Sequence, residues 1–526
     1  MSVQIARIGG ETAEQYSADI VGGKAANLAR MAALGLPVPP AFVLPISLCA
    51  ATVNGEASAA QDLAAALAEG IQFLEKTTGK KFGDRRRPLL VSVRSGAARS
   101  MPGMLDTVLN VGCSLPAVHG LVRMTGHPRF ANDCRRRFLE SYGTVVLGID
   151  RTEFANTRDA LVAAEHVGSE AALDCDAIEH LAAAYERVIE DDGRVLSDDP
   201  TEHLISAAQA VFRSWMSDRA GTYRRLQHLE DLQGTAVTVQ AMVFGNAGGS
   251  SGAGVAFSRD PSSGVATPVI DVLFDSQGED VVSGDHNPET ENALAVSLPQ
   301  AANDLRAALR RLEDEFADVQ DVEFTIENGM MLQTRAAKRT PRAALRLAID
   351  FVKEGRISAA EGLSRLDGVD LRALVNKRLV IAAQPIGHGT CASSGVAVGR
   401  AAFDSDSAAR FAAGGDPVIL VRPDTTTADV AGFATAAGIV TAVGGRTAHA
   451  ALVARQMGKP CIVGCTALSI GPAARAAQLA GTAIGEGDWL SIDGEAGAIY
   501  LGRGDVVTER PEAELAEVER WRAAAA

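Results

Sequence analysis

The segment from Gly438 to Pro460 constrains the fold of this chain more than any other part of its 526 residues. An apolar, strand-like run, GIVTAV, leads into a pair of glycines. A helix-like run follows and stops at Gly458-Lys459-Pro460. Thr447 stands at the expected N-cap, because threonine is a preferred residue just before a helix. The pattern therefore predicts a strand, a tight turn and a helix, which together form the repeating unit of an α/β domain.

His449 falls in the first turn of that predicted helix. The free backbone N–H groups and the helix dipole at this end favour an anion, such as a phosphate carried on an imidazole. Imidazole is also a competent nucleophile, with an ordinary pKa of about 6.5. A lone histidine more often caps a helix or packs in a core, so a structural role is the alternative. The glycine turn, the cap and the helix start together favour the phosphate-carrying role.

The residues of this segment, GGRTAHAALVARQMGKP, resemble the phosphohistidine motif of the phosphoenolpyruvate-utilising enzymes. Five further stretches resemble the pyruvate phosphate dikinase branch of that family, in the family's order: VGGKAANLARMAALGLPVPPAF, LLVSVRSGAARSMPGMLDTVLN, RFANDCRRRFLESYGTVVLG, TVQAMVFGNAGGSSGAGVAFSRDPSSG and DVEFTIENGMMLQTRAAKRT. The resemblance implies that His449 is phosphorylated and lies on a swivelling domain. It also implies that Gly444, Gly445, Thr447 and Arg455 support the phosphohistidine.

Several side chains in the first two thirds of the chain suit nucleotide phosphates. Lys24 follows Gly22-Gly23 at a predicted helix start, and Arg94 ends the strand-like run LLVSVR before a loop of small residues. Both cations are placed where they can meet phosphate. Asp321 and Glu323 are two residues apart on a predicted strand, so their carboxylates share one face, as suits Mg²⁺ bound to a nucleotide. Taken singly, such residues are more often surface charges or a solvated strand face.

The resemblance assigns roles to these residues and to some of their neighbours. His449 would be the catalytic nucleophile, assisted by Lys24 and Arg94. ATP and inorganic phosphate would be bound by Lys24, Arg94, Ser95, Gly96, Gln240, Asp321, Glu323, Gln333 and Arg335. Mg²⁺ would be held by Asp321, Glu323 and Gln333.

The length predicts three or four domains at roughly 150 residues each. We expect α/β and α+β domains: an ATP-grasp-like nucleotide-binding domain with a helical insertion, as the resemblance implies, and a swivelling phosphohistidine β/α domain. The expected boundaries are 1–340 for the first domain, with its insertion at about 113–230, 341–385 for a helical linker, 386–504 for the swivelling domain and 505–526 for a C-terminal helix with little apolar surface. Strand character is expected at 236–246, 277–284 and 321–335, the last as a hairpin, and a Gly/Ser loop at 247–254 matches the family's nucleotide lid.

Composition excludes several other classes of protein. The net charge of −15 counts against a nucleic-acid binder and against an anionic membrane surface as the partner. We find no apolar run of membrane-spanning length and no secretion signal, so we expect a cytoplasmic protein. The seven cysteines are scattered and form no CxxC pair, which argues against a disulfide framework and a structural zinc site.

The chain departs from the family pattern at three places. It stops at residue 526, where the resembling enzymes would begin a (β/α)₈ barrel for pyruvate and phosphoenolpyruvate. Ala448 replaces the usual serine before the histidine, and Asp285-His286-Asn287-Pro288 replaces a usual Arg-Thr-Pro, which removes an expected cation near the nucleotide.

The resulting hypothesis is a pyruvate phosphate dikinase-like phosphotransferase. MgATP, with inorganic phosphate, would phosphorylate His449, which passes the group to pyruvate or another acceptor bound by a separate barrel protein. A homodimer is also compatible with the sequence. The alternatives are a non-catalytic nucleotide-binding regulator and a kinase for a different small molecule. A phosphotransferase-system protein is disfavoured, since that system loads its histidine from phosphoenolpyruvate.

Overall fold

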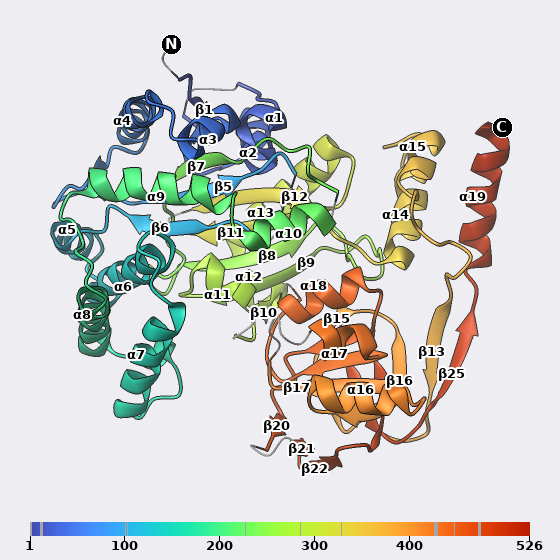
Figure 1. Cartoon of the computed structure of the whole chain (residues 1–526). Helices are drawn as coiled ribbons and strands as arrows, with labels where there is room; N and C mark the ends of the chain where they lie inside the picture. The colour runs from blue at the N-terminus through green and yellow to red at the C-terminus, as the bar shows by residue number, and fades with distance from the viewer. Residues whose placement is uncertain are drawn as a thin grey trace. The chain divides into compact units, whose positions relative to one another are not determined.

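The computed structural model describes residues 3–10, 14–99, 101, 104–226, 228–283, 286–327, 329–424, 430–446, 448–471 and 475–525. The chain forms two compact units (Figure 1). Unit 1 consists of Met1–Gly248 with Met331–Thr334, and unit 2 consists of Gly249–Met330 with Arg335–Ala526. In the described part of the chain, no helix has the length and the apolar character that crossing a membrane requires.

Unit 1 is built on an antiparallel sheet of order β1-β2-β7-β5-β6. Its strands are β1 (Ala6–Ile8), β2 (Ala41–Leu44), β7 (Ala236–Ala241), β5 (Val91–Gly96) and β6 (Thr107–Val111). Val91 and Val93 are fully buried on one face of β5, whereas Arg94 lies on the other face and is partly exposed. Because side chains alternate along a strand, this pattern separates an apolar face from a polar one.

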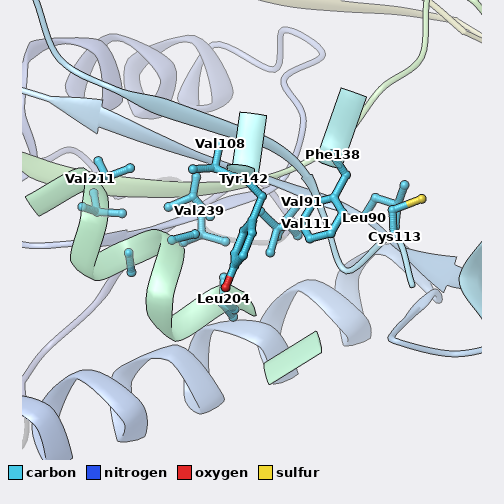
Figure 2. Close-up of a cluster of buried hydrophobic side chains, with 14 of the residues drawn as sticks. Leu90, Val91, Val108, Val111, Cys113, Phe138, Tyr142, Leu204, Val211 and Val239 are labelled. Atoms are coloured by element: carbon cyan, nitrogen blue, oxygen red, sulfur yellow. The ribbon is translucent and has the colours of Figure 1, made fainter. Parts of the chain in front are cut away.

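Several helices of unit 1 pack against that sheet. The first helices are α1 (Ala18–Val21), α2 (Gly23–Ala33), α3 (Ile46–Val53) and α4 (Ala59–Thr78), and a short ribbon pairs β3 (Lys81–Phe82) with β4 (Pro88–Leu89). The range expected for the helical insertion, about 113–230, contains α5 (Leu115–Thr125), α6 (Pro128–Val145), α7 (Arg151–Ala164), α8 (Cys175–Asp191), α9 (Pro200–Ser214) and α10 (Asp218–Leu226), with a 3₁₀ turn at Glu170–Ala172. Figure 2 shows the core between this insertion and the sheet, where Phe138 and Tyr142 of α6 lie among valines of β5, β6 and β7.

The first sheet of unit 2 has the order β10-β9-β8-β11-β12. Its strands are β8 (Gly252–Phe257), β9 (Val269–Phe274), β10 (Glu289–Thr290), β11 (Gln320–Ile326) and β12 (Met330–Ala336), of which residues 331–334 cluster with unit 1. The hairpin expected at 321–335 is thus confirmed. Helices α12 (Glu291–Ser297) and α13 (Pro299–Phe316) also belong to this part of the chain.

Two expectations for this region are corrected. Residues 278–283 form helix α11 (Gly278–Ser283) rather than a strand, and the Asp280 carboxylate accepts a hydrogen bond from the backbone N–H of Gln277 at its start. The Gly/Ser loop is shorter than 247–254, because β8 already begins at Gly252. A Cβ at Gly254 would lie 2.4 Å from the Asp271 carbonyl oxygen and 2.2 Å from the Phe324 ring, so glycine lets these strands pack closely.

The second sheet of unit 2 contains the segment with which the sequence analysis began. Its strand order is β14-β24-β23-β16-β17-β18-β19-β15, with parallel pairing from β16 through β19. Three helices, α16 (Ser405–Ala413), α17 (Val430–Thr435) and α18 (His449–Gln456), connect the parallel strands β16 (Val396–Ala402), β17 (Val418–Arg422), β18 (Gly438–Thr441) and β19 (Cys461–Val463). The antiparallel strands are β14 (Gly387–His388), β15 (Thr390–Ser393), β23 (Trp489–Asp493) and β24 (Ala498–Leu501), and a small sheet joins β20 (Leu468–Ile470), β21 (Ala476–Leu479) and β22 (Thr482–Gly485).

The segments around this second sheet form a helical pair and a ribbon. Helices α14 (Pro341–Lys353) and α15 (Ala359–Ser364) lie in the range expected for the linker, and β13 (Asn376–Val380) pairs antiparallel with β25 (Asp505–Glu509). Within 505–526, the range expected to form one helix, residues 505–509 form strand β25 and helix α19 spans Glu512–Ala525. It has more apolar surface than expected, because Val518 and Trp521 are buried with residues of α14 and α15.

Candidate functional site

His449 is the first residue of α18, which follows the carboxyl end of the parallel strand β18. Ligands of open α/β sheets bind at this edge, where helix N-termini also meet. The expected N-cap at Thr447 is wrong by one residue, because Ala448 occupies the cap position and its side chain makes no capping hydrogen bond. Thr447 itself and the side chain of His449 lie outside the described residues.

The two glycines before the histidine are held against the segment that follows α11. The backbone N–H of Gly444 donates to the Asn287 side-chain oxygen at 3.1 Å, and Gly444 has a φ of +109° that glycine adopts easily. A Cβ at Gly445 would lie 2.4 Å from Cγ of Pro288. The glycine pair therefore allows a closely packed turn, and part of the departing segment 285–288 contacts the predicted phosphohistidine loop. Asp285 lies outside the described residues.

Arg446 joins this loop to the first sheet of unit 2. Its backbone N–H and its guanidinium donate to the two carboxylate oxygens of Asp271, each at 2.8 Å. The Asp271 side chain is only 4% exposed, so the ion pair is largely shielded from water. Because the carboxylate accepts from the backbone N–H of Arg446 as well as from its guanidinium, the contact fixes the orientation of the loop.

Arg455, at the other end of α18, points toward the same sheet. Its guanidinium carbon lies 5.4 Å from the centre of the Phe257 ring on β8, and it donates to the Ala392 carbonyl oxygen at 3.1 Å. Burial lowers the pKa of Arg455, and Asp321 and Asp271 oppose that shift. Arg446 before the histidine helix thus pairs with Asp271 of β9, and Arg455 within the helix feels the charge of Asp321 of β11.

Three of the predicted ATP-binding residues come together in unit 1. Arg94 donates to the Gln333 side-chain oxygen at 3.4 Å, and the Gln333 amide donates to the Gln240 side-chain oxygen at 3.0 Å. Gln240 is 2% exposed and donates in turn to the Pro39 carbonyl oxygen at 3.0 Å. Ser92 pairs with Gln240 across β5 and β7, and Arg94 is two residues further along, so both side chains share the polar face. Nε of Arg94 is buried and meets no hydrogen-bond acceptor in the described part of the chain.

Lys24 is the second residue of α2, and its side chain is exposed. The start of α2 packs on the chain just after β5, where the Gly23 N–H donates to the Ala97 carbonyl oxygen at 2.9 Å. A Cβ at Gly22 would lie 2.0 Å from the Gly96 carbonyl oxygen, so this contact requires glycine at position 22. Ser95 is on the face of β5 opposite to Arg94 by strand alternation.

Asp321 and Glu323 lie on one face of β11, as expected from their spacing. Their partners across the strand pair are Phe257 and Val255, and Asp321 is 6% exposed. Within the described residues there is no group of three or more His, Cys, Asp or Glu side chains that could form a complete metal cage. Two carboxylates fit Mg²⁺ that arrives with a nucleotide, since such ions take one or two carboxylates and complete their shell with phosphates and water. Arg335 is on β12, but its side chain is outside the described residues.

Sequence reasoning missed Arg446 and Asp271. Arg446 occupies a variable position inside the quoted motif, and Asp271 lies on a strand 175 residues away, so the pair is visible only once the fold brings them together. It also missed Asp133 of α6, a buried carboxylate that accepts hydrogen bonds from Arg136, Arg137 and Asn246. The sequence did hold a signal here, since the run Arg135-Arg136-Arg137 on a helix needs nearby acids.

Two family models match the chain. The AMP/ATP-binding domain of pyruvate phosphate dikinase matches residues 55–298, and the mobile domain of the PEP-utilising enzymes matches residues 414–497. These ranges contain Arg94 and Gln240 in the first case and His449 in the second.

Curated relatives match across nearly the whole chain. A pyruvate, phosphate dikinase of Clostridium symbiosum is 41% identical over 499 residues, which are 93% of this chain and 57% of the relative. One of Rhizobium meliloti (strain 1021) is 41% identical over 96% of this chain and 58% of the relative, and one of Giardia intestinalis is 39% identical over 97% and 60%. The chain therefore spans less than two thirds of the length of these relatives. The chain thus contains the AMP/ATP-binding domain of pyruvate phosphate dikinase and the mobile domain of the PEP-utilising enzymes, and it is similar to pyruvate, phosphate dikinases over nearly all of its length.

Proposed function

We propose that the chain uses MgATP, together with inorganic phosphate, to phosphorylate His449. The observation that carries the proposal is the position of His449 at the start of α18, behind a glycine turn at the carboxyl end of a parallel strand. A phosphoryl group on the imidazole would lie at the positive end of the helix dipole. The match to the AMP/ATP-binding domain supports ATP as the donor.

The proposed transfer has two chemical steps. An imidazole nitrogen of His449 bonds to the β-phosphorus of ATP, the bond from that phosphorus to the α-phosphate oxygen breaks, and AMP leaves. An oxygen of inorganic phosphate then bonds to the γ-phosphorus, the β–γ bridge breaks, and pyrophosphate leaves. The β-phosphoryl group remains on the histidine, whose ring proton is lost to solvent.

The chain's own residues bind and orient the nucleotide in this proposal. Arg94, held in place by Gln333 and Gln240, and Lys24 at the start of α2 bind phosphate oxygens and offset the charge that develops during transfer. Asp321 and Glu323 of β11, with Gln333, would hold the Mg²⁺ that accompanies the nucleotide and screens its phosphates. We further propose the ATP-grasp-like organisation and the domain boundaries given above.

Pyruvate is the proposed final acceptor, by analogy with the relatives. A separate barrel protein would present it, and a homodimer of this chain is a further proposal. A different small molecule as acceptor remains the second candidate. One experiment distinguishes the two candidates: the phosphorylated chain is mixed with pyruvate and a pyruvate-binding barrel from a relative. Transfer of the phosphoryl group to pyruvate would support the first candidate.

The first experiment incubates the chain with Mg²⁺ and ATP labelled at the β-position, with and without inorganic phosphate. Acid-labile, base-stable label on the chain that is absent from a His449→Asn variant is the expected result. Measurable ATP binding without any label on the wild-type chain would refute the catalytic proposal and leave a nucleotide-binding regulator. A matched His388→Asn variant, on a histidine of the same domain, should label like the wild type.

A further inference from the structure

Arg446 contacts one anionic group, and the proposed reaction would create a second one close by in the sequence, on His449. The visible group is Asp271, which it contacts through its guanidinium and through its backbone N–H, each at 2.8 Å. The second is the phosphoryl group on His449. Two residues lie between Arg446 and His449, so their Cα atoms are at most about 10–11 Å apart.

The turn between these residues brings them closer than that limit. The backbone N–H of Ala448 donates to the Gly445 carbonyl oxygen at 3.2 Å, which closes a turn with Arg446 at its first central position. His449 then begins α18 directly after the turn. Arg446 and His449 are therefore on the same tight loop, and this loop sits on β9 through Asp271.

The sheet beneath this loop carries concentrated negative charge. Asp271 and Asp321 are 3% and 6% exposed, and both act on Arg455 together with Asp260. In the unphosphorylated chain, Arg446 and Arg455 compensate this charge. A phosphoryl group adds up to about two negative charges at the same loop, as phosphate groups do near neutral pH.

We infer that Arg446 is a positioning residue with two alternative partners: it holds the loop on the sheet through Asp271 while His449 is unphosphorylated, and it pairs with the phosphoryl group once His449 carries one. This inference rests on the proposed function of His449. A guanidinium binds phosphate oxygens in a bidentate manner as well as it binds a carboxylate, so the exchange keeps its hydrogen bonds satisfied. The exchange leaves the buried Asp271 carboxylate without its cation and next to added negative charge. Loading of the histidine thereby weakens the contact that positioned it and releases the loop.

The test uses the full chain with a distance reporter across this contact. Spin labels are placed at Asn292 of α12 and Gln478 of β21, which are both exposed, after Cys175 and Cys391 are replaced by serine, because the other five cysteines are buried. His449 is phosphorylated chemically with phosphoramidate, so that the measurement does not depend on ATP chemistry. A His449→Asn variant controls for phosphorylation at other histidines.

The expected wild-type result is one short distance before phosphorylation and a predominantly longer, broader distribution after it. Asp271→Asn and Arg446→Gln should show the long distribution before phosphorylation. Both should also lower the rate of labelling from β-labelled ATP by at least about tenfold, since Asp271→Asn removes the anion that anchors Arg446 and Arg446→Gln leaves the buried Asp271 carboxylate without its cation. In Arg446→Gln the phosphohistidine should also hydrolyse faster than in the wild type. Arg475→Gln, on an exposed arginine of the same domain, should behave as the wild type does in every measurement.

The charge-swapped double variant, Asp271→Arg with Arg446→Asp, distinguishes a switch from a simple ion pair. In this variant part of the molecules should return to the short distance, because the side-chain pair reforms while the backbone hydrogen bond of residue 446 is lost. Phosphorylation should then fail to release the histidine loop, because the arginine now on the sheet attracts the phosphoryl group. Release of the swapped variant, or an unchanged distance in the phosphorylated wild type, would overturn the inference. Absence of labelling from ATP, with release still seen after phosphoramidate, would refute the proposed function of the chain and leave the switch intact.

Discussion

At the scale of single residues, this structure requires glycine where two segments pack closely, and it requires each buried charge to be paired with an opposite charge or a hydrogen-bond donor. Gly22, Gly254 and Gly445 each stand where a Cβ would lie within 2.5 Å of another atom. Real Cβ atoms do not approach so closely, so these positions exclude every other residue unless the backbone moves. Asp133 shows the second kind of dependence, because a buried carboxylate is tolerated only when donors surround it.

Replacement of Gly445 by alanine should disturb the loop that carries His449. The added methyl group would lie 2.4 Å from Cγ of Pro288 and 3.1 Å from a carboxylate oxygen of Asp271. We expect labelling of His449 from β-labelled ATP to slow by at least about tenfold, because even a small displacement of a reacting group slows its reaction strongly. Nucleotide affinity should stay unchanged. Gly471→Ala is the matched control, because its nearest contact would be an ordinary 3.6 Å. Equal rates for both variants would contradict the expectation.

Replacement of Asp133 by asparagine should destabilise unit 1. Burial would raise the pKa of Asp133, but Arg137 and Arg136 outweigh that effect and hold it well below its usual range. The variant should lose about 3–5 kcal/mol of unfolding free energy at pH 7, since the buried arginines lose their anion. The unfolding free energy of unit 1 alone is measured by urea unfolding followed by Trp215 fluorescence. Trp489 and Trp521 are replaced by phenylalanine for this purpose.

The pH dependence of stability in the wild type and in Asp133→Asn gives a second test. A carboxyl group whose pKa is depressed in the folded state contributes stability above its unfolded pKa of about 3.9 and loses it as the pH falls further. The difference in unfolding free energy between wild type and Asp133→Asn should therefore be constant from pH 7 to about pH 5 and shrink below about pH 3.9. A difference that stays constant down to pH 3 would show that the carboxylate is not stabilised by its arginines.

At the scale of elements, α18 and α19 show how short helices depend on their surroundings. The eight residues of α18 have no side-chain cap, and an isolated helix of this length is unstable in water. Its alanines at 450, 451 and 454 are buried among residues of β17, β18 and β19, which supplies the missing stability. The helix that places His449 is therefore held by the sheet rather than by its own sequence.

Helix α19 should detach when Trp521 is removed. Trp521 is 6% exposed, packs with α14 and α15, and contacts Gly362, where a Cβ would lie 3.0 Å from the indole ring. Trp521→Ala should cost about 3–5 kcal/mol in the local stability of this contact. Amide hydrogen exchange should then accelerate across α19 and α15 and remain unchanged in α6. Arg520→Ala, on an exposed residue of the same helix, should leave the exchange of both helices unaltered.

At the scale of the whole molecule, the proposed nucleotide-binding residues belong to both compact units. Arg94 and Gln240 lie in unit 1, as does Gln333, whereas Asp321 and Glu323 lie in unit 2. A ligand that binds only the folded state stabilises what it contacts by an amount set by its concentration and affinity. A nucleotide engaged by Arg94, Gln240 and Gln333 must therefore stabilise unit 1.

The expected outcome can be measured with the natural tryptophans. Trp215 reports on unit 1, whereas Trp489 and Trp521 report on unit 2. MgATP at a hundred times its dissociation constant should raise the unfolding free energy seen by Trp215 by up to about 2.7 kcal/mol. Single-reporter variants with the other tryptophans replaced by phenylalanine separate the signals of the two units. An unchanged Trp215 transition would contradict binding by these three residues.

The sequence by itself determined the features that are local. The strand, glycine turn and helix around His449, the helical insertion from Leu115 to Leu226 and the carboxylates on one face of β11 follow from spacing and turn residues within short stretches. The helix at 278–283 was mistaken for a strand because six residues carry too little periodicity to decide. The motif order also sufficed to predict the family.

Only the tertiary structure decided which distant residues meet. Arg446 pairs with Asp271 across 175 residues, Gln333 reaches Arg94 across 239, and Asn287 contacts the histidine loop across 157. No local pattern encodes such pairs, because a charge or an amide in a sequence does not specify its partner. The partner is set by strand order and by the packing of helices on sheets, which depend on the burial of the chain as a whole.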